Sequence, residues 1–199
     1  MPKVLLPWFL LGVGLFFVGM ITGNTDLKLM SKAIPVVVLA ISVWGRGAMG
    51  RTVGIGLALG ATGDVVLELG HFLPGLVVFL IGHLFYVAAF WREQRAFSPL
   101  SALPPLIYVG ALLSLCLPGA GAFAAPIAVY GLVIGVMAWR ATAWGHPLGV
   151  IGAYIFAFSD SVIAINKFLL PLSYAAPLII VTYWTGQFLL AASVPTRTE

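Results

Sequence analysis

The sequence predicts an all-α integral membrane protein: a bundle of about eight transmembrane helices forming one polytopic domain, residues 1–199, with both termini in the cytoplasm. Hydrophobic residues make up 61% of the chain, and its mean hydropathy is +1.10. Only 8% of the residues are charged, compared with roughly 25% in an ordinary soluble domain. Such a chain cannot cover itself with polar surface, so most of its surface must face hydrocarbon.

Apolar segments separated by Pro, Gly or charged residues mark the expected helices. A spanning helix needs about 20 predominantly apolar residues. The segments that approach this length are 4–21, 33–44, 52–68, 72–91, 100–117, 123–139, 148–165 and 172–194. No small-residue cleavage site follows the first segment, so we expect it to stay as a helix. The second is short, so it must borrow residues 27–30, tilt or re-enter, and seven helices remain an alternative.

The basic residues predict the orientation of the chain. If all eight segments cross, the side of the amino terminus holds Lys3, Arg46, Arg51, Arg92, Arg95, Arg140 and Arg197. The opposite side holds Lys28, Lys32 and Lys167. This excess of positive charge is typical of the cytoplasmic side. The basic residues are scattered and the net charge is only +4, so we expect no nucleic-acid partner. Cys116, the single cysteine, excludes an internal disulfide and a thiolate metal cluster.

One candidate site lies at the end of the third segment. Three glycines at helical spacing form a smooth stripe there, Gly56, Gly60 and Gly63. The same face continues to Asp64, an ionisable residue that is costly at membrane depth and therefore a functional candidate. Glu68 and His71 follow at helical spacing, so all three side chains could face one cavity. Alternatively, Glu68 and His71 form a solvated helix end.

Asp160 is a second deep carboxylate, well inside the seventh segment. Two acids at comparable depth on separate helices can have pKa values that are pushed apart, which leaves one protonated as an acid and the other ionised as a base. The alternative is that each aspartate simply joins helices through hydrogen bonds.

Other polar side chains fall on faces that can point inward. His83 and Tyr86 share one face of the fourth segment with three phenylalanines, Phe72, Phe79 and Phe90. They can contact a polar head group, or form a hydrogen-bonded core pair. Tyr183 and Gln187 lie one turn apart in the last segment. Lys32 and Asn166 stand at segment ends, where a lysine can neutralise a phosphate or simply extend to the interface.

An ordered set of residues resembles the YhhN-like membrane family, which contains the lysoplasmalogenases. The resemblance covers nearly the whole chain. It rests on Lys32 followed by Ile34-Pro35; Gly63-Asp64; Gly75 with Phe79, His83, Tyr86 and Phe90; Tyr130 with Met137; Phe158-Ser159-Asp160-Ser161 with Asn166 and Phe168; and Tyr183 with Gln187. It does not extend to Glu68 and His71.

The resemblance implies an eight-helix hydrolase that cleaves the vinyl ether bond of lysoplasmalogens, releasing a fatty aldehyde and a glycerophospho-head-group. Asp64 and Asp160 look like the family's catalytic carboxylates. We expect the substrate-binding residues to be Lys32, His83, Tyr86, Asn166, Tyr183 and Gln187. Vinyl ether hydrolysis needs one acid and one base, with no metal and no organic cofactor. The expected partners are the lysophospholipid substrate and membrane lipids, and the expected location is the bacterial inner membrane.

Two other function classes fit some of these residues. A small proton-coupled transporter also uses intramembrane Asp and His, although the sequence offers no inverted repeat of interrupted helices. A metal-dependent lipid hydrolase would instead collect carboxylate and imidazole ligands. Its candidate ligands are Asp64, Glu68, His71, His83 and Asp160.

Overall fold

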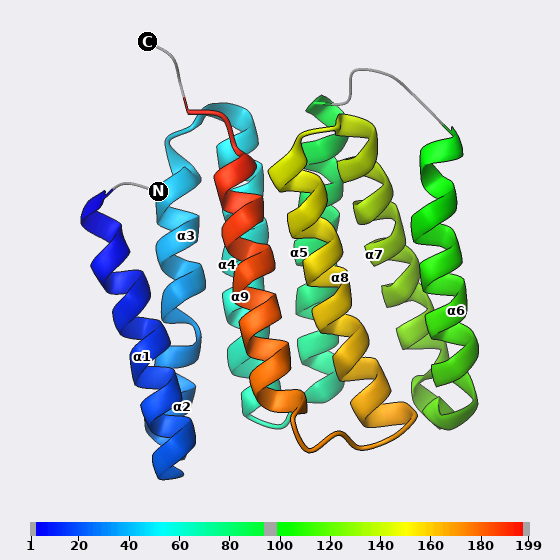
Figure 1. The fold of residues 1–199 in the computed structure, drawn as a ribbon, viewed down its shortest axis with the longest axis horizontal. Coiled ribbons are helices and arrows are strands. Elements are labelled where there is room, and N and C mark those ends of the chain that lie inside the picture. The colour runs from blue at the N-terminus through cyan, green and yellow to red at the C-terminus, as the bar shows by residue number, and fades with distance from the viewer. Residues whose placement is uncertain (1–2, 94–98, 197–199) are drawn as a thin grey trace. The chain divides into compact units, whose positions relative to one another are not determined.

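Helices form all the regular structure of the described residues, 3–93 and 99–196, in this computed structural model (Figure 1). The α-helices are α1 (Leu6–Thr22), α2 (Thr25–Lys32), α3 (Ile34–Trp44), α4 (Gly47–Glu68), α5 (Phe72–Glu93), α6 (Leu103–Ala120), α7 (Ala124–Trp144), α8 (Pro147–Phe168) and α9 (Ala175–Ser193). Short 3-10 helices are η1 (Lys3–Leu5), η2 (Pro99–Ala102) and η3 (Gly121–Phe123). The all-α prediction is confirmed.

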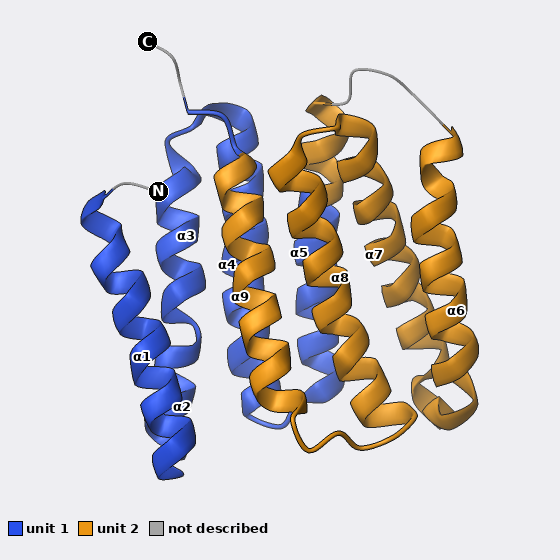
Figure 2. Cartoon of the chain, viewed as in Figure 1, with its two compact units in different colours: residues 1–86, 194–199 blue, residues 87–193 orange. Residues whose placement is uncertain are grey.

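The chain folds into two compact units (Figure 2). The first unit comprises residues 1–86 and 194–199, and so contains α1 to α4 and most of α5. The second unit comprises residues 87–193 and contains the end of α5 together with α6 to α9.

Six stretches among the described residues are long and apolar enough to cross a membrane, which identifies a multi-pass membrane protein. They are Lys3–Thr22, Thr25–Trp44, Phe72–Glu93, Pro99–Trp144, Pro147–Phe168 and Ala175–Ser193. The 46-residue stretch Pro99–Trp144 includes both α6 and α7. Helix α4 is not among the six, and its glycines and charged side chains lower its mean hydropathy. The count of about eight crossings stays a prediction.

The short second segment of the sequence is a broken helix. Residues 25–44 form a 20-residue apolar stretch that is interrupted at Ala33, between α2 and α3. Pro35 explains the break, because proline has no N–H to donate to the carbonyl four residues earlier and its ring crowds that carbonyl. The Ser31 carbonyl accepts instead from the Ala33 N–H. The expected extension of the short segment into residues 27–30 is thus observed, with an interruption at Ala33.

The basic residue Arg140 does not lie in a connection between helices, as the sequence had suggested. Helix α7 continues five residues beyond the expected end, to Trp144, and Arg140 is only 2% exposed. Its guanidinium lies 3.5 Å from the centre of the Trp91 ring and 3.9 Å from that of Trp139. Aromatic faces stabilise a desolvated cation, which is how the second unit retains this arginine. Arg95 and Arg197 lie outside the described residues.

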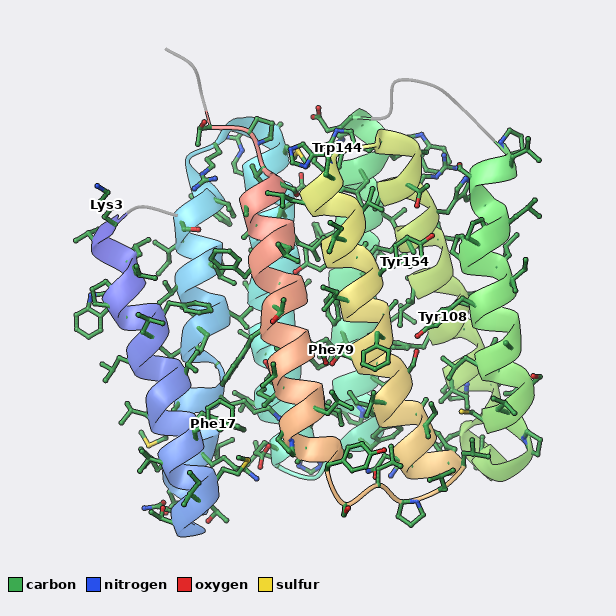
Figure 3. All side chains as sticks on the ribbon, in the orientation of Figure 1. Lys3, Phe17, Phe79, Tyr108, Trp144 and Tyr154 are labelled. Carbon is green, nitrogen blue, oxygen red and sulfur yellow. The ribbon has the colours of Figure 1, made fainter. Side chains whose placement is uncertain are left out.

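Glycines set the close packing of helix pairs within each unit. In the first unit a Cβ on Gly56 would lie 2.5 Å from the Tyr86 ring, and a Cβ on Gly63 would lie 2.6 Å from the Phe79 ring. Phe79 is labelled in Figure 3. In the second unit α8 and α9 meet at Gly152 and Gly186, where an added Cβ would lie within 3.1 Å of the facing backbone. The predicted glycine stripe of α4 therefore packs against the aromatic face of α5.

Candidate active site

The first unit brings two lysines of α2 onto the two acids at the end of α4. Asp64 is buried, and its Oδ1 lies 4.0 Å from Lys32 Nζ. Glu68 follows one turn later, at the last residue of α4. Lys32 Nζ donates to Glu68 Oε2 at 2.9 Å, and Lys28 Nζ lies 2.5 Å from Glu68 Oε1. Each oxygen of the Glu68 carboxylate thus has its own ammonium group.

The local sequence explains why both lysines face α4. Asn24 begins α2 by accepting a hydrogen bond from the Leu27 N–H at 2.9 Å, as a good N-cap residue does. Lys28 and Lys32 then lie four residues apart, so they share one face of the helix. We name the group Lys28, Lys32, Asp64 and Glu68 the lysine–acid cluster. It carries two positive and two negative formal charges.

His71 does not continue the line of the two acids. Helix α4 ends in a Schellman motif, in which the His71 N–H donates to Val66 O at 3.1 Å and the Gly70 N–H donates to Leu67 O at 3.0 Å. Gly70 supplies the left-handed backbone that this motif requires, with φ at 84°. The chain turns away at that point and leaves His71 exposed. The helical spacing of His71 was therefore the wrong guide to its position.

His83 and Tyr86 are both buried on α5, and their rings meet edge to face with centroids 6.3 Å apart. His83 Nδ1 lies 2.6 Å from the Phe79 carbonyl oxygen. Since a carbonyl only accepts, the ring proton is on Nδ1. The Tyr86 ring lies against Gly56. Spacing placed both residues on an inward face, and the structure supports that placement.

The second unit contains a separate cluster of polar side chains around Asp160. The Tyr130 hydroxyl of α7 donates to Asp160 Oδ2 at 2.9 Å, and both residues are buried. On the next residue of α8, Ser161 Oγ lies 2.6 Å from the hydroxyl of Tyr108, which belongs to α6 and is labelled in Figure 3. Asp160 therefore lies where three helices of this unit present hydroxyl groups.

The remaining expected substrate-binding residues are also in the second unit. Asn166 Oδ1 accepts a hydrogen bond from the Leu172 N–H at 2.7 Å, which holds the connection between α8 and α9. Tyr183 is buried on α9 and meets the Phe156 ring edge to face, with centroids 5.3 Å apart. Gln187 is fully buried one turn later. Tyr183 and Gln187 thus share the helix face that packs near α8.

The expected residues therefore form two groups, one in each unit. Lys32 and Asp64 belong to the lysine–acid cluster, whereas Asp160 belongs with Tyr130. Sequence reasoning did not assign a role to Lys28, although its spacing from Lys32 was a usable signal. It also passed over the pairing of Tyr108 with Ser161, which no pattern within one helix can reveal.

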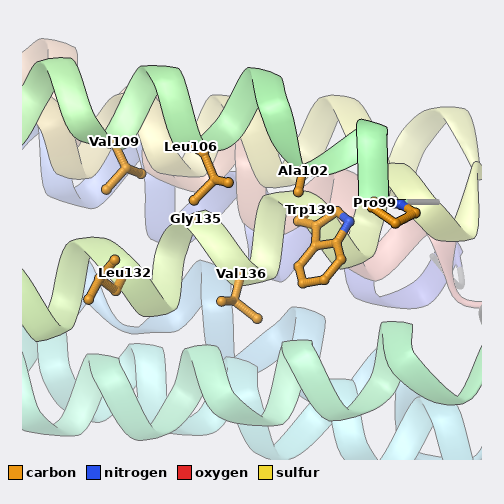
Figure 4. A pocket seen from close by; sticks show the side chains of 8 residues that line it. All are labelled: Pro99, Ala102, Leu106, Val109, Leu132, Gly135, Val136 and Trp139. Atoms are coloured by element: carbon orange, nitrogen blue, oxygen red, sulfur yellow. The ribbon is translucent and has the colours of Figure 1, made fainter. Parts of the chain in front are cut away.

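A groove between α6 and α7 has a different character (Figure 4). Its volume is about 240 Å³. The residues that line it are Pro99, Ala102, Leu106, Val109, Leu132, Gly135, Val136 and Trp139. The only side-chain hydrogen-bonding group in this set, the Trp139 indole N–H, donates to Ser101 Oγ at 3.1 Å. None of the lining side chains is an acid or a base, so this groove offers no group for proton transfer.

A metal site is not favoured by the side chains that the structure describes. Within residues 3–93 and 99–196, no three His, Cys, Asp or Glu side chains are close enough together to hold one ion. His71, one of the five candidate ligands, lies exposed after the end of α4.

Comparison with known proteins gives a consistent family. The model of the YhhN family matches residues 27–194. The human protein named lysoplasmalogenase TMEM86A is 38% identical over 73% of this chain, and the match spans 65% of the length of that relative. Human lysoplasmalogenase TMEM86B is 35% identical over 81% of this chain and 73% of its own.

A bacterial relative extends the comparison. The Mycobacterium tuberculosis protein named lysoplasmalogenase is 30% identical over 88% of this chain and 75% of its own length. No solved structure matches the chain. The helices, the buried acids and a family match that covers most of the sequence agree, and the chain belongs to the YhhN family.

Proposed function

We propose that this protein is a membrane hydrolase that cleaves the vinyl ether bond of lysoplasmalogens, with Asp64 and Asp160 as its catalytic residues. Membership of the YhhN family, with relatives named lysoplasmalogenase, supports the reaction. The observation that carries the site is the burial of two carboxylates on membrane helices, each beside a polar donor. Burying an ionisable side chain in a membrane protein costs free energy, so such a residue is a functional candidate.

The proposed reaction begins with proton transfer from a carboxylic acid to the carbon–carbon double bond of the vinyl ether. This gives an oxocarbenium ion, which the second aspartate stabilises as a carboxylate. The same carboxylate takes a proton from the attacking water, so that a hemiacetal forms. The hemiacetal then collapses to a fatty aldehyde and the glycerol hydroxyl of the head group. The first aspartate takes the proton of the hemiacetal hydroxyl, and the second aspartate gives the proton it took from water to the leaving glycerol oxygen. One water is consumed, and both aspartates return to their starting protonation states.

The surrounding residues have proposed roles in this reaction. Tyr130 donates to Asp160, a hydrogen bond that an ionised carboxylate accepts. Lys32, His83, Tyr86, Asn166, Tyr183 and Gln187 shape the substrate pocket. For the whole chain we propose about eight crossings of a bacterial inner membrane, with both termini in the cytoplasm.

The test of this proposal is aldehyde release from a lysoplasmalogen by the purified full chain in detergent. Asp64→Asn and Asp160→Asn should each abolish turnover while the thermal unfolding midpoint stays close to that of the wild type. Asp26→Asn is the matched control, because Asp26 is an exposed aspartate in the first turn of α2. An ester-linked lysophospholipid should release no aldehyde. Full activity in both single variants would contradict the two-aspartate mechanism.

A further inference from the structure

In the lysine–acid cluster, Lys28 and Lys32 together form an anion clamp, and the anion that they hold is the Glu68 carboxylate. Two lysines one turn apart on α2 each approach a different oxygen of one carboxylate, at 2.5 Å and 2.9 Å. A phosphate diester presents the same features to such a clamp, two free oxygens that share one negative charge. Compact ammonium groups on flexible stems are common phosphate binders.

The side chains of the cluster extend from the exposed end of α4 to the buried Asp64. The side chains of Lys28, Lys32 and Asp64 are 30%, 15% and 5% exposed, so burial increases along this line. Lys32 Nζ lies 2.9 Å from Glu68 and 4.0 Å from Asp64, and therefore connects the two acids. An anion at the position of Glu68 would be held beside the buried aspartate.

The spacing of the two acids suits a lysophospholipid. Glu68 and Asp64 are four residues apart on α4, about 6 Å along the helix axis. In a lysoplasmalogen the phosphate and the vinyl ether oxygen are attached to opposite ends of the glycerol backbone. A phosphate on the two lysines would therefore bring the vinyl ether to the depth of Asp64.

We propose that Lys28 and Lys32 form the phosphate subsite for the lipid head group, and that Glu68 is a resident anion which the substrate phosphate displaces. The proposal rests on the proposed function for the identity of the lipid. At rest Glu68 offsets part of the positive charge of the two lysines, which lowers the cost of keeping two cations at a membrane helix end. Glu68 is the last residue of α4, next to the exposed Gly70 and His71, so its side chain has room to turn outward.

The experiment measures binding of two probes that differ in the head group, to the purified full chain in detergent. One is a saturated acyl lysophosphatidylethanolamine, and the other is a monoacylglycerol with the same chain. We expect Lys28→Met/Lys32→Met to weaken binding of the phospholipid on the order of tenfold or more and to leave the monoacylglycerol unchanged. Glu68→Gln should bind the phospholipid more tightly than the wild type, because the competing anion is gone.

Lys167→Met is the matched control, since Lys167 is an exposed lysine at the end of α8, outside the cluster. If the double variant fails to fold, Lys28→Met alone should weaken phospholipid binding in the same direction. Equal binding of both probes in wild type and lysine variants would overturn the proposal, as would weaker phospholipid binding in Glu68→Gln. Full displacement of the phospholipid by inorganic phosphate alone would overturn the assignment to a lipid head group.

The two proposals fail in different ways. If the wild type releases no aldehyde but the lysine variants still lose phospholipid selectively, the hydrolase proposal is wrong and the phosphate subsite stands. If aldehyde is released and Lys28→Met changes neither KM nor phospholipid binding, the subsite is wrong and the hydrolase stands.

Discussion

At the scale of single residues, the hydrogen bond from Tyr130 to Asp160 is the contact with the clearest chemical consequence. A hydroxyl that donates to a buried carboxylate replaces part of the hydration that the ion has lost. Without this donor the ionised form of Asp160 would lose a charge-assisted hydrogen bond, which is typically worth about 1.5–3 kcal/mol. Tyr130 is thus a positioning residue for Asp160 in the proposed reaction.

We predict that Tyr130→Phe lowers kcat/KM for aldehyde release by about 10- to 100-fold. The ring volume is kept, so the thermal unfolding midpoint should change little. Tyr154→Phe is the matched control, because the Tyr154 hydroxyl accepts only a long hydrogen bond from Thr142 Oγ1, at 3.4 Å, within the part of the chain that the structure describes. A normal rate in Tyr130→Phe would show that this hydroxyl does not serve the reaction.

Arg140 shows why a residue type alone does not give a position. The sequence suggested an arginine in a cytoplasmic connection, because basic residues usually mark the ends of spans. The structure instead buries it between Trp91 and Trp139. Trp139 is its neighbour in the chain, but Trp91 is on another helix, and only tertiary structure brings the second ring to the guanidinium.

At the scale of elements, glycine determines how closely α4 and α5 approach. A methyl group on Gly63 would lie 2.6 Å from the buried Phe79 ring, closer than van der Waals contact allows. The ring or the helix would have to move, and overpacking of this kind typically costs about 1–3 kcal/mol. The sequence predicted the stripe, whereas the aromatic partners became known only from the structure.

We predict that Gly63→Ala lowers the free energy of unfolding by about 1–3 kcal/mol, measured by thermal or detergent-induced unfolding. Gly14→Ala is the matched control, because a Cβ on Gly14 of α1 would meet nothing within 4 Å. Alanine is the better helix former, so this control should be neutral or slightly stabilising. Equal destabilisation by both changes would exclude the close packing of α4 on α5 as the cause.

Helix ends were the least predictable part of the elements. The expected ranges overlap the observed helices, but α4 begins five residues earlier than expected and α7 ends five residues later. His71 was placed on the α4 face by spacing, whereas Gly70 ends the helix before it. Composition shows where apolar segments are, but hydrogen bonds at the caps decide their last residues.

At the scale of the whole molecule, the proposed topology places Lys3 and His71 on opposite sides of the membrane. Three crossings separate them if α1, the broken helix α2–α3 and α4 all span. We predict that the His71→Cys variant reacts with an impermeant maleimide in intact cells. Lys3→Cys should react only after the membrane is opened.

The native Cys116 is buried and should give little background in this measurement. Labelling of both positions from the same side would mean that one of the three segments does not cross. Helix α4 would be the first to suspect, since it is not among the six stretches that meet the length and hydropathy of a span.

The sequence by itself determined the membrane environment, the helical class and the family, because these depend on composition, local periodicity and the order of residues along the chain. It also singled out Asp64 and Asp160, since acids among apolar residues are conspicuous. The tertiary structure decided which groups meet them. The pairing of Glu68 with Lys28 and Lys32, and that of Tyr130 with Asp160, join positions about 30 or more residues apart. Such contacts depend on how helices pack, which no local pattern records.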